Sequence, residues 1–194
     1  MSPTPLTARL KNGDPSAFEE IFTALNSTLI RVAASITGNR ATAEEVTQET
    51  WLAVIENLGT YRGDAPLRHW ILRILSNKAR TRATRDGKTE PLDTFQVGFP
   101  DQFTESGDWA VAPSLWEEIT PERILSGRQT WELVQEEIRN LPSSQQAVLS
   151  LFEHEKMSSG ECAEILGMTP ANVRVQLHRA REKIRQVLDA EASK

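Results

Sequence analysis

The sequence has few of the residues on which disulfide and zinc scaffolds depend. Cys162 is its only cysteine among 194 residues, and there are three histidines. One cysteine cannot close an internal disulfide, and these residues cannot supply the usual zinc ligands at the usual spacing. We therefore expect no disulfide, no metal site and no cofactor. Cys162 itself is interpreted as a small core residue.

Long apolar runs and catalytic motifs are missing as well. No run reaches the roughly 18 residues that a membrane helix needs, and residues 1–9 lack the apolar core of a signal peptide. There is no phosphate-cradling glycine loop, no Ser/His/Asp pattern and no carboxylate pair in a plausible cleft. We therefore expect a cytoplasmic protein that has no membrane insertion and is not an enzyme.

The charge is unevenly distributed along the chain. The formal net charge is −5, but residues 62–88 carry eight Lys or Arg against two Asp. Residues 89–122 carry eight acidic residues and no basic one, and residues 170–187 carry five basic residues against one Glu. The average charge therefore does not exclude nucleic acid as a partner, because the two basic segments can act locally.

The first half of the chain predicts a helical domain over residues 1–87. Asp14-Pro15 is typical of a helix start, and apolar residues then recur at three- and four-residue steps until Gly38. Thr42 with Glu45 has the spacing of a capping box, which predicts the start of a second helix. A third helix follows from about Leu67. The second helix has an acidic outer face and the third a basic one.

Residues 88–120 lose this periodicity and are acidic, with scattered Pro, Gly and aromatic residues. Because so long a segment is unusual inside a compact domain, we predict an acidic linker between two domains. Helical patterns return over residues 121–194. The chain is therefore predicted to be all-α, with two small helical domains joined by this linker.

The second domain carries a helix-turn-helix pattern. Ser143 with Gln146 predicts one cap, and Ser158 with Glu161 predicts a capping box that starts a further helix. Gly167 ends that helix and Thr169-Pro170 starts the next one. A short helix, a tight glycine turn and a longer basic helix are typical of domains that place the second helix in the DNA major groove.

The outer side of this second helix supplies candidate DNA contacts. With Val173, Leu177 and Ala180 facing inward, six residues are predicted to be exposed: Asn172, Arg174, Val175, His178, Arg179 and Arg181. Such groups can contact base edges, phosphates and a thymine methyl. Spacing alone also fits a solvated basic face on a structural helical hairpin.

Two further surfaces lie in the first domain. Tyr61 and Trp70 lie among cations on and before the third helix, an arrangement that suits unstacked bases; Trp70 equally fits the apolar stripe of that helix. The exposed glutamates of the second helix lie on an open face that suits no acid-base task, so a basic protein partner is the better interpretation.

Taken together, the motifs resemble the extracytoplasmic-function group of bacterial sigma-70-type sigma factors. The resemblance rests on AEEVTQETW at 43–51, YRGD at 61–64, LRHWILRILSN at 67–77, LP at 141–142, ECAEILG at 161–167 and VRVQLHRAR at 173–181. These motifs follow one another in the family's order through both halves of the chain.

The resemblance implies a role for each surface. It implies that Glu45, Gln48 and Glu49 bind core RNA polymerase. It implies that the minus-ten promoter element is recognised and melted by Tyr61, Arg62, Gly63, Asp64, Trp70, Arg73, Asn77 and Arg80. The helix at 170–187 would read the minus-35 element through Arg174, Val175, His178, Arg179 and Arg181, with Asn172 at its start. It also implies control by an anti-sigma factor.

A second interpretation is a free-standing helix-turn-helix regulator with an N-terminal interaction domain. A sigma factor needs core polymerase for tight promoter binding, whereas a regulator of that kind binds duplex DNA alone. A third and weaker interpretation is an enzyme that has lost its motifs.

Overall fold

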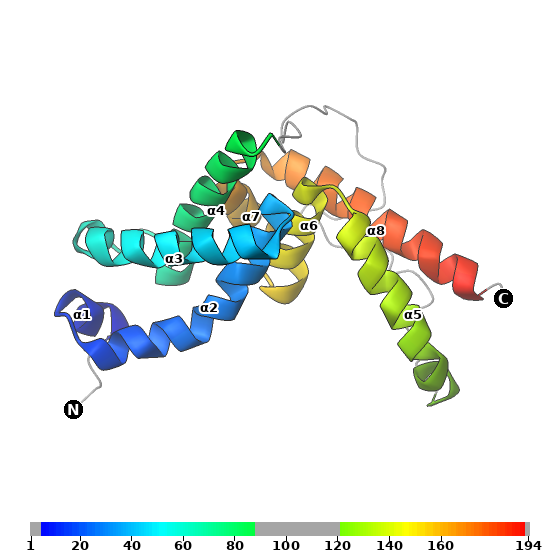
Figure 1. The fold of residues 1–194 in the computed structure, drawn as a ribbon, viewed down its shortest axis with the longest axis horizontal. Coiled ribbons are helices and arrows are strands. Elements are labelled where there is room, and N and C mark those ends of the chain that lie inside the picture. The colour runs from blue at the N-terminus through cyan, green and yellow to red at the C-terminus, as the bar shows by residue number, and fades with distance from the viewer. Residues whose placement is uncertain (1–4, 88–120, 193–194) are drawn as a thin grey trace. The chain divides into compact units, whose positions relative to one another are not determined.

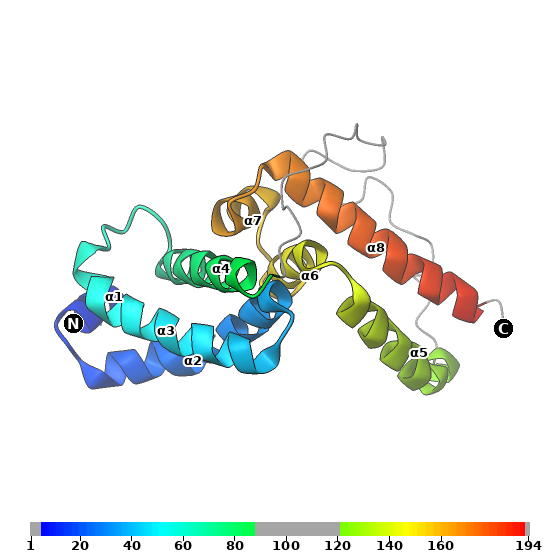
Figure 2. The same cartoon turned by 45° about the horizontal axis from the view of Figure 1, so that its top comes forward.

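The computed structural model describes residues 5–87 and 121–192, with side chains described for 5–87 and 131–190. All regular elements within these ranges are helical, which confirms the all-α prediction. The chain forms two compact units, one that contains α1 to α4 and one that contains α5, α6, α8 and the first part of α7 (Figures 1 and 2). The predicted linker over 88–120 lies outside the described residues.

The first unit is a bundle of three long helices with a short one at its start. Its elements are α1 (Leu6–Lys11), α2 (Pro15–Thr37), α3 (Arg40–Asn57), a 3-10 turn η1 (Leu58–Thr60) and α4 (Leu67–Arg85). The three long helices all pack on one another. Leu29 and Val32 from α2 and Ile71 and Leu75 from α4 are fully buried, so they form the centre of this core.

The second unit is built around a long C-terminal helix. Its elements are α5 (Pro121–Asn140), α6 (Ser143–Leu149), a π-helical segment η3 (Ser150–His154), α7 (Ser159–Leu166) and α8 (Pro170–Ala192). Helix α8 packs against α5 and α6. Val148, Leu151, Val173 and Leu177 are at most 1% exposed and make up much of its core.

Several predicted helix ends are confirmed. The Asp14 side chain caps α2 by accepting the Ser16 N–H at 2.9 Å, and Gly38 ends that helix with φ 65°. At α7, Ser158 and Glu161 form the full reciprocal capping box. Such local signals depend on neighbouring residues alone, which is why the sequence reveals them.

Two predicted caps are wrong. Helix α3 begins at Arg40, because Asn39 rather than Thr42 is the capping residue and accepts the Thr42 N–H at 3.0 Å. Helix α6 has Pro142 at its cap position and no side-chain cap. There the Gln146 amide instead donates to the backbone oxygens of Arg139 and Leu141, at 3.0 and 2.8 Å. Helix α1 was not predicted, and the helix predicted from Ser143 through Phe152 ends as the π-helical segment η3.

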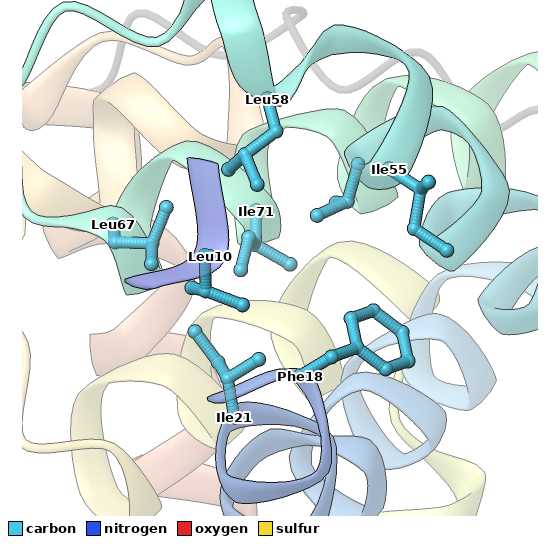
Figure 3. A pocket seen from close by; sticks show the side chains of 8 residues that line it. Leu10, Phe18, Ile21, Ile55, Leu58, Leu67 and Ile71 are labelled. Atoms are coloured by element: carbon cyan, nitrogen blue, oxygen red, sulfur yellow. The ribbon is translucent and has the colours of Figure 1, made fainter. Parts of the chain in front are cut away.

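Helix α1 closes one end of the first core. Figure 3 shows Leu10 from α1 directed toward Phe18 and Ile21 of α2 and toward Ile71 of α4. The void among these side chains measures about 10 Å³ and has a purely apolar lining. Helix α1 therefore covers apolar side chains of α2 and α4 at this end of the bundle.

The capping carboxylate of α2 predicts an acid-sensitive contribution to stability. Hydrogen bonds from Ser16 and then from Arg9 lower the pKa of Asp14 from 3.8 to about 2. A lowered folded-state pKa stabilises the fold above the unfolded-state value, and that contribution is lost as the pH falls from about 4 to about 2. Asparagine also caps helices. Thermal unfolding should therefore show Asp14→Asn less stable than the parent at neutral pH, with the gap closing toward about pH 2.

If the stability difference between Asp14→Asn and the parent stayed constant from neutral pH to about pH 2, the charged Asp14 carboxylate would not be the source of that stability.

Candidate nucleic-acid interface

The α7–α8 hairpin has the local geometry of a helix-turn-helix. Gly167 ends α7 in the left-handed region with φ 61°, and the Met168 N–H donates to the Ala163 oxygen at 3.0 Å. The Thr169 hydroxyl then accepts the Asn172 N–H at 3.2 Å at the start of α8. The predicted three-residue turn and both flanking helices are therefore confirmed.

The outer side of α8 presents part of the predicted contact set. Arg174, Val175, His178 and Arg179 are half-buried, whereas Val173 and Leu177 are buried in the core. Arg174 and His178 are four residues apart and so share one side of the helix. Their groups form the candidate base-reading surface.

Asn172 was predicted to be exposed, and this is wrong. It is only 7% exposed, because the first turns of α8 pack on α6. The Gln176 amide donates to the Asn172 oxygen at 3.1 Å, and the Ser144 hydroxyl of α6 donates to the Gln176 oxygen at 3.5 Å. This buried polar chain fixes the position of α8 on α6.

Arg181 was also predicted to be exposed, and its side chain is only 13% exposed. Its guanidinium donates to the Glu153 carboxylate at 2.6 and 3.1 Å and lies 5.2 Å from the centre of the Phe152 ring. Both partners belong to η3. Arg181 therefore ties α8 to η3, a contact that the helical periodicity of the sequence does not reveal.

Loss of this tie should lower the stability of the second unit. We expect Arg181→Ala to reduce the free energy of unfolding by about 1–2 kcal/mol, because hydrogen bonds between charged groups stabilise a fold more than hydrogen bonds between neutral groups. Arg185→Ala is the matched control, since its side chain is 48% exposed and pairs along the helix with Asp189. That control should change stability by less than about 0.5 kcal/mol. Chemical denaturation of both variants measures the difference.

Equal losses in the two variants would show that the contact with η3 contributes nothing of its own.

The loop before α4 is anchored by Tyr61. This residue is 8% exposed, its hydroxyl donates to the Ala65 oxygen at 2.5 Å, and its ring lies 5.3 Å from that of Trp70. Arg62, Gly63 and Asp64 are exposed at the tip of the loop. Tyr61 was predicted to stack on a base, but in this structure its ring packs inside the protein and holds the loop in place.

The outer side of α4 presents polar groups at helical spacing. Arg73 and Asn77 are exposed and lie four residues apart, so they share one side of the helix. The Arg80 guanidinium donates to the Asn77 side-chain oxygen at 2.6 Å. Trp70 is half-buried against Tyr61, which agrees with its place on the apolar stripe.

The acidic face of α3 has partners on α4 that the sequence did not indicate. Glu45 pairs with Arg82 at 2.8 Å, and Glu49 lies 3.8 Å from Lys78. The two glutamates remain 57% and 52% exposed, so these ion pairs are worth little individually. Gln48 is exposed on the same side. The face predicted to bind a partner is therefore accessible but partly neutralised by α4.

Sequence reasoning missed two apolar residues on this face. Leu52 is 62% exposed and Ile55 is 56% exposed. Together with Gln48 they repeat at steps of four and three residues, which places them on the outer side of α3. Large exposed apolar groups beside charged ones are typical of protein interfaces. Their spacing was the signal that could have revealed them.

Cys162 is a core residue, as predicted. Its side chain is fully buried, and this burial, followed by the charge of Glu161, raises the pKa of the thiol to about 12. The thiolate is therefore essentially absent at neutral pH, and the residue is not a nucleophile.

None of the described helices is long and apolar enough to cross a membrane.

Comparison with known proteins agrees with this division of the chain. The family model for sigma-70 region 2 matches residues 21–89, and that for sigma-70 region 4 matches residues 131–184. A region 2 followed by a region 4 defines a protein of the sigma-70 class.

Relatives of similar length narrow the class further. The chain is 27% identical to the RNA polymerase sigma-H factor of Pseudomonas aeruginosa, over 94% of this chain and 92% of that one. It is 26% identical to the ECF RNA polymerase sigma-E factor of Haemophilus influenzae, over 92% and 91%. The chain belongs to the extracytoplasmic-function group of the sigma-70 family.

Solved structures share its fold. CnrH in complex with the cytosolic domain of CnrY has a TM-score of 0.58 at 23% identity, covering 95% of this chain and 96% of that one. The sigma factor RpoE of Bartonella quintana, in complex with the anti-sigma factor NepR, has a TM-score of 0.58 at 17% identity, covering 89% and 96%.

Proposed function

We propose that this chain binds core RNA polymerase in the cytoplasm and directs it to promoters, without catalysing a reaction itself. In this proposal residues 1–87 bind polymerase and act on the minus-ten element. Residues 121–194 read the minus-35 element, and residues 88–120 link the two.

The outer face of α3 carries the proposal. A helix-turn-helix alone fits a free-standing regulator equally well, so the discriminating feature must lie in the first unit. There the face defined by Glu45, Gln48, Glu49, Leu52 and Ile55 combines exposed carboxylates with exposed apolar groups. Such a face suits a protein surface with matching cations and an apolar centre.

The proposed division of labour assigns two kinds of DNA contact. The half-buried groups of α8, Arg174 and His178 above all, suit base edges of duplex DNA. The exposed loop tip at 62–64 and the Arg73 and Asn77 side chains of α4 suit unpaired bases, because they offer donors and acceptors outside a groove.

We further propose that an anti-sigma protein controls this chain. Support comes from the two structural relatives, which are described as complexes with the cytosolic domain of CnrY and with the anti-sigma factor NepR. An exposed apolar face on α3 suits a reversible protein inhibitor as well as polymerase.

Reconstituted transcription tests the proposed function. The purified full chain is mixed with core polymerase and a library of bacterial promoter fragments, and run-off transcripts are sequenced. We expect transcripts from a defined promoter class that depend on both the chain and the core enzyme. Tight binding of specific duplex sites by the chain alone, with no effect on transcription start sites, would support the free-standing regulator instead.

A further inference from the structure

Helix α1 lies before the segment that matches region 2, yet it is firmly attached to the first unit. Arg9 pairs with Asp14 at 2.9 Å and with Glu20 at 3.0 Å, both at the start of α2. Leu10 is 8% exposed and packs against Phe18 in the core (Figure 3). These contacts fix the place of the last residue of the helix, Lys11.

Lys11 reaches across fifty residues of sequence to the loop before α4. Its ammonium donates to the backbone oxygen of Tyr61 at 2.6 Å. The same ammonium lies 5.9 Å from the centre of the Tyr61 ring, within the range of a cation–π contact. One cation therefore engages both the backbone and the ring of the residue that anchors the loop.

The loop is held at its base while its tip stays accessible. Tyr61 is fixed by Lys11 on one side and by Trp70 and the Ala65 oxygen on the other. Beyond it, Gly63 has φ 85°, in the region that favours glycine, and turns the exposed tip back toward α4. A recess of about 270 Å³ lies between α1 and the loop, lined by Thr7, Ala8, Lys11, Tyr61, Arg62 and Gly63.

We propose that Lys11 is a positioning residue for the promoter-reading loop at 61–64, an inference that rests on the proposed function of that loop. The ammonium selects one conformation of the Tyr61 backbone and so presents Arg62 and Asp64 in a fixed arrangement. A loop that samples other conformations binds DNA more weakly. Its apparent affinity is the intrinsic affinity multiplied by the fraction of time that the loop spends in the competent conformation. Helix α1 is thus part of the minus-ten interface without touching DNA through Lys11.

The first test measures the loop in the full chain without polymerase. Lys11→Met keeps most of the aliphatic stem and removes the charge, whereas Lys11→Arg keeps a donor able to reach the Tyr61 oxygen. Exchange of the Tyr61 amide, whose N–H donates to the Leu58 oxygen at 3.2 Å, should rise about five- to tenfold in Lys11→Met, the effect expected for loss of one charged hydrogen bond. Lys11→Arg should exchange close to the parent rate.

The control is Arg40→Met, which removes the same charge from the first turn of α3. That residue is 82% exposed and lies at the far end of an 18-residue helix from the loop. Exchange of the Tyr61 amide in Arg40→Met should match the parent. Unchanged exchange in Lys11→Met would overturn the proposal.

The second test measures promoter opening with core polymerase. Permanganate reactivity of minus-ten thymines should fall about five- to tenfold in Lys11→Met and recover in Lys11→Arg, while binding of the duplex minus-35 element stays at the parent level. A loss that affects minus-35 binding equally, or that follows a lowered unfolding midpoint, would assign Lys11 a merely structural role and overturn the proposal. Unimpaired opening despite faster exchange would overturn it too.

Promoter opening by the parent chain shows whether a negative result concerns Lys11 or the proposed function as a whole. If the parent itself opens no promoter with core polymerase, the proposed function fails and the assignment of Lys11 fails with it. If the parent opens promoters and Lys11→Met does so equally well, only the assignment of Lys11 fails.

Discussion

Replacing both Glu45 and Glu49 by lysine should remove most binding of the chain to core RNA polymerase. Both carboxylates lie on the exposed face of α3 beside Leu52 and Ile55. Removing one partner of a charge pair buried at the centre of a protein interface lowers the binding free energy by about 2–5 kcal/mol, and reversing its charge adds repulsion. Fluorescence anisotropy of the labelled chain with core enzyme measures the affinity, and we expect a loss of at least about thirtyfold.

The structure adds a confounding effect that a matched variant removes. Because Glu45 pairs with Arg82 inside the chain, Glu45→Arg alone also places two cations side by side. Adding Arg82→Glu restores an internal ion pair in the opposite orientation. If the face binds polymerase, this double variant should fold like the parent and still bind poorly. If the chain with Glu45→Arg and Arg82→Glu bound polymerase like the parent, the loss of binding in the glutamate-to-lysine variant would be explained by the broken Glu45–Arg82 pair and not by the docking face.

Replacing Arg174 by alanine should relax promoter preference at one minus-35 position. Arg174 and His178 lie on the same side of α8, away from Val173 and Leu177, where a helix in the major groove meets base edges. An arginine that reads a base contributes about 1–3 kcal/mol of discrimination. Transcription from a library of randomised minus-35 elements measures both the loss and the change in preference.

Arg179 provides the contrast, because it lies toward the edge of that side and is predicted to hold a phosphate. Arg179→Ala should weaken binding to all minus-35 variants alike. It should also reduce the slope of the logarithm of the binding constant against the logarithm of the salt concentration by about one. A parent-like preference profile for Arg174→Ala would place Arg174 on the DNA backbone and leave Val175 and His178 to supply specificity.

The sequence predicted the helical framework well because the signals for it are local. Asp14-Pro15, the Ser158/Glu161 box and the Gly167 turn each act within a few residues, and all three lie where they were predicted. Where a neighbour offered an equally good cap, the prediction failed: Asn39 replaces Thr42 at the start of α3. Helix α1 was missed because six residues are too few to show a period.

The candidate surfaces were predicted less completely, since periodicity tells which way a side chain points but not what it meets. The acidic side of α3 and the basic side of α4 were each placed outward, and both are accessible. Their edges nevertheless meet, through Arg82 with Glu45 and Lys78 with Glu49. The crossing of two helices decides such contacts, and no local pattern encodes it.

The sequence by itself determined the helical class, the helix-turn-helix and the family, because capping, periodicity and motif order are properties of neighbouring residues. Only the tertiary structure decided which polar groups remain available for partners. It buried Asn172 against α6, tied Arg181 to Glu153 and placed Lys11 on the Tyr61 backbone. Each of these side chains is polar and fits a surface by sequence alone. For Arg181 and Lys11, packing brings a complementary group from a distant segment within hydrogen-bond distance, although Lys11 itself stays exposed. Asn172 is buried against α6 and is paired with Gln176 of its own helix, because a buried polar group must be paired.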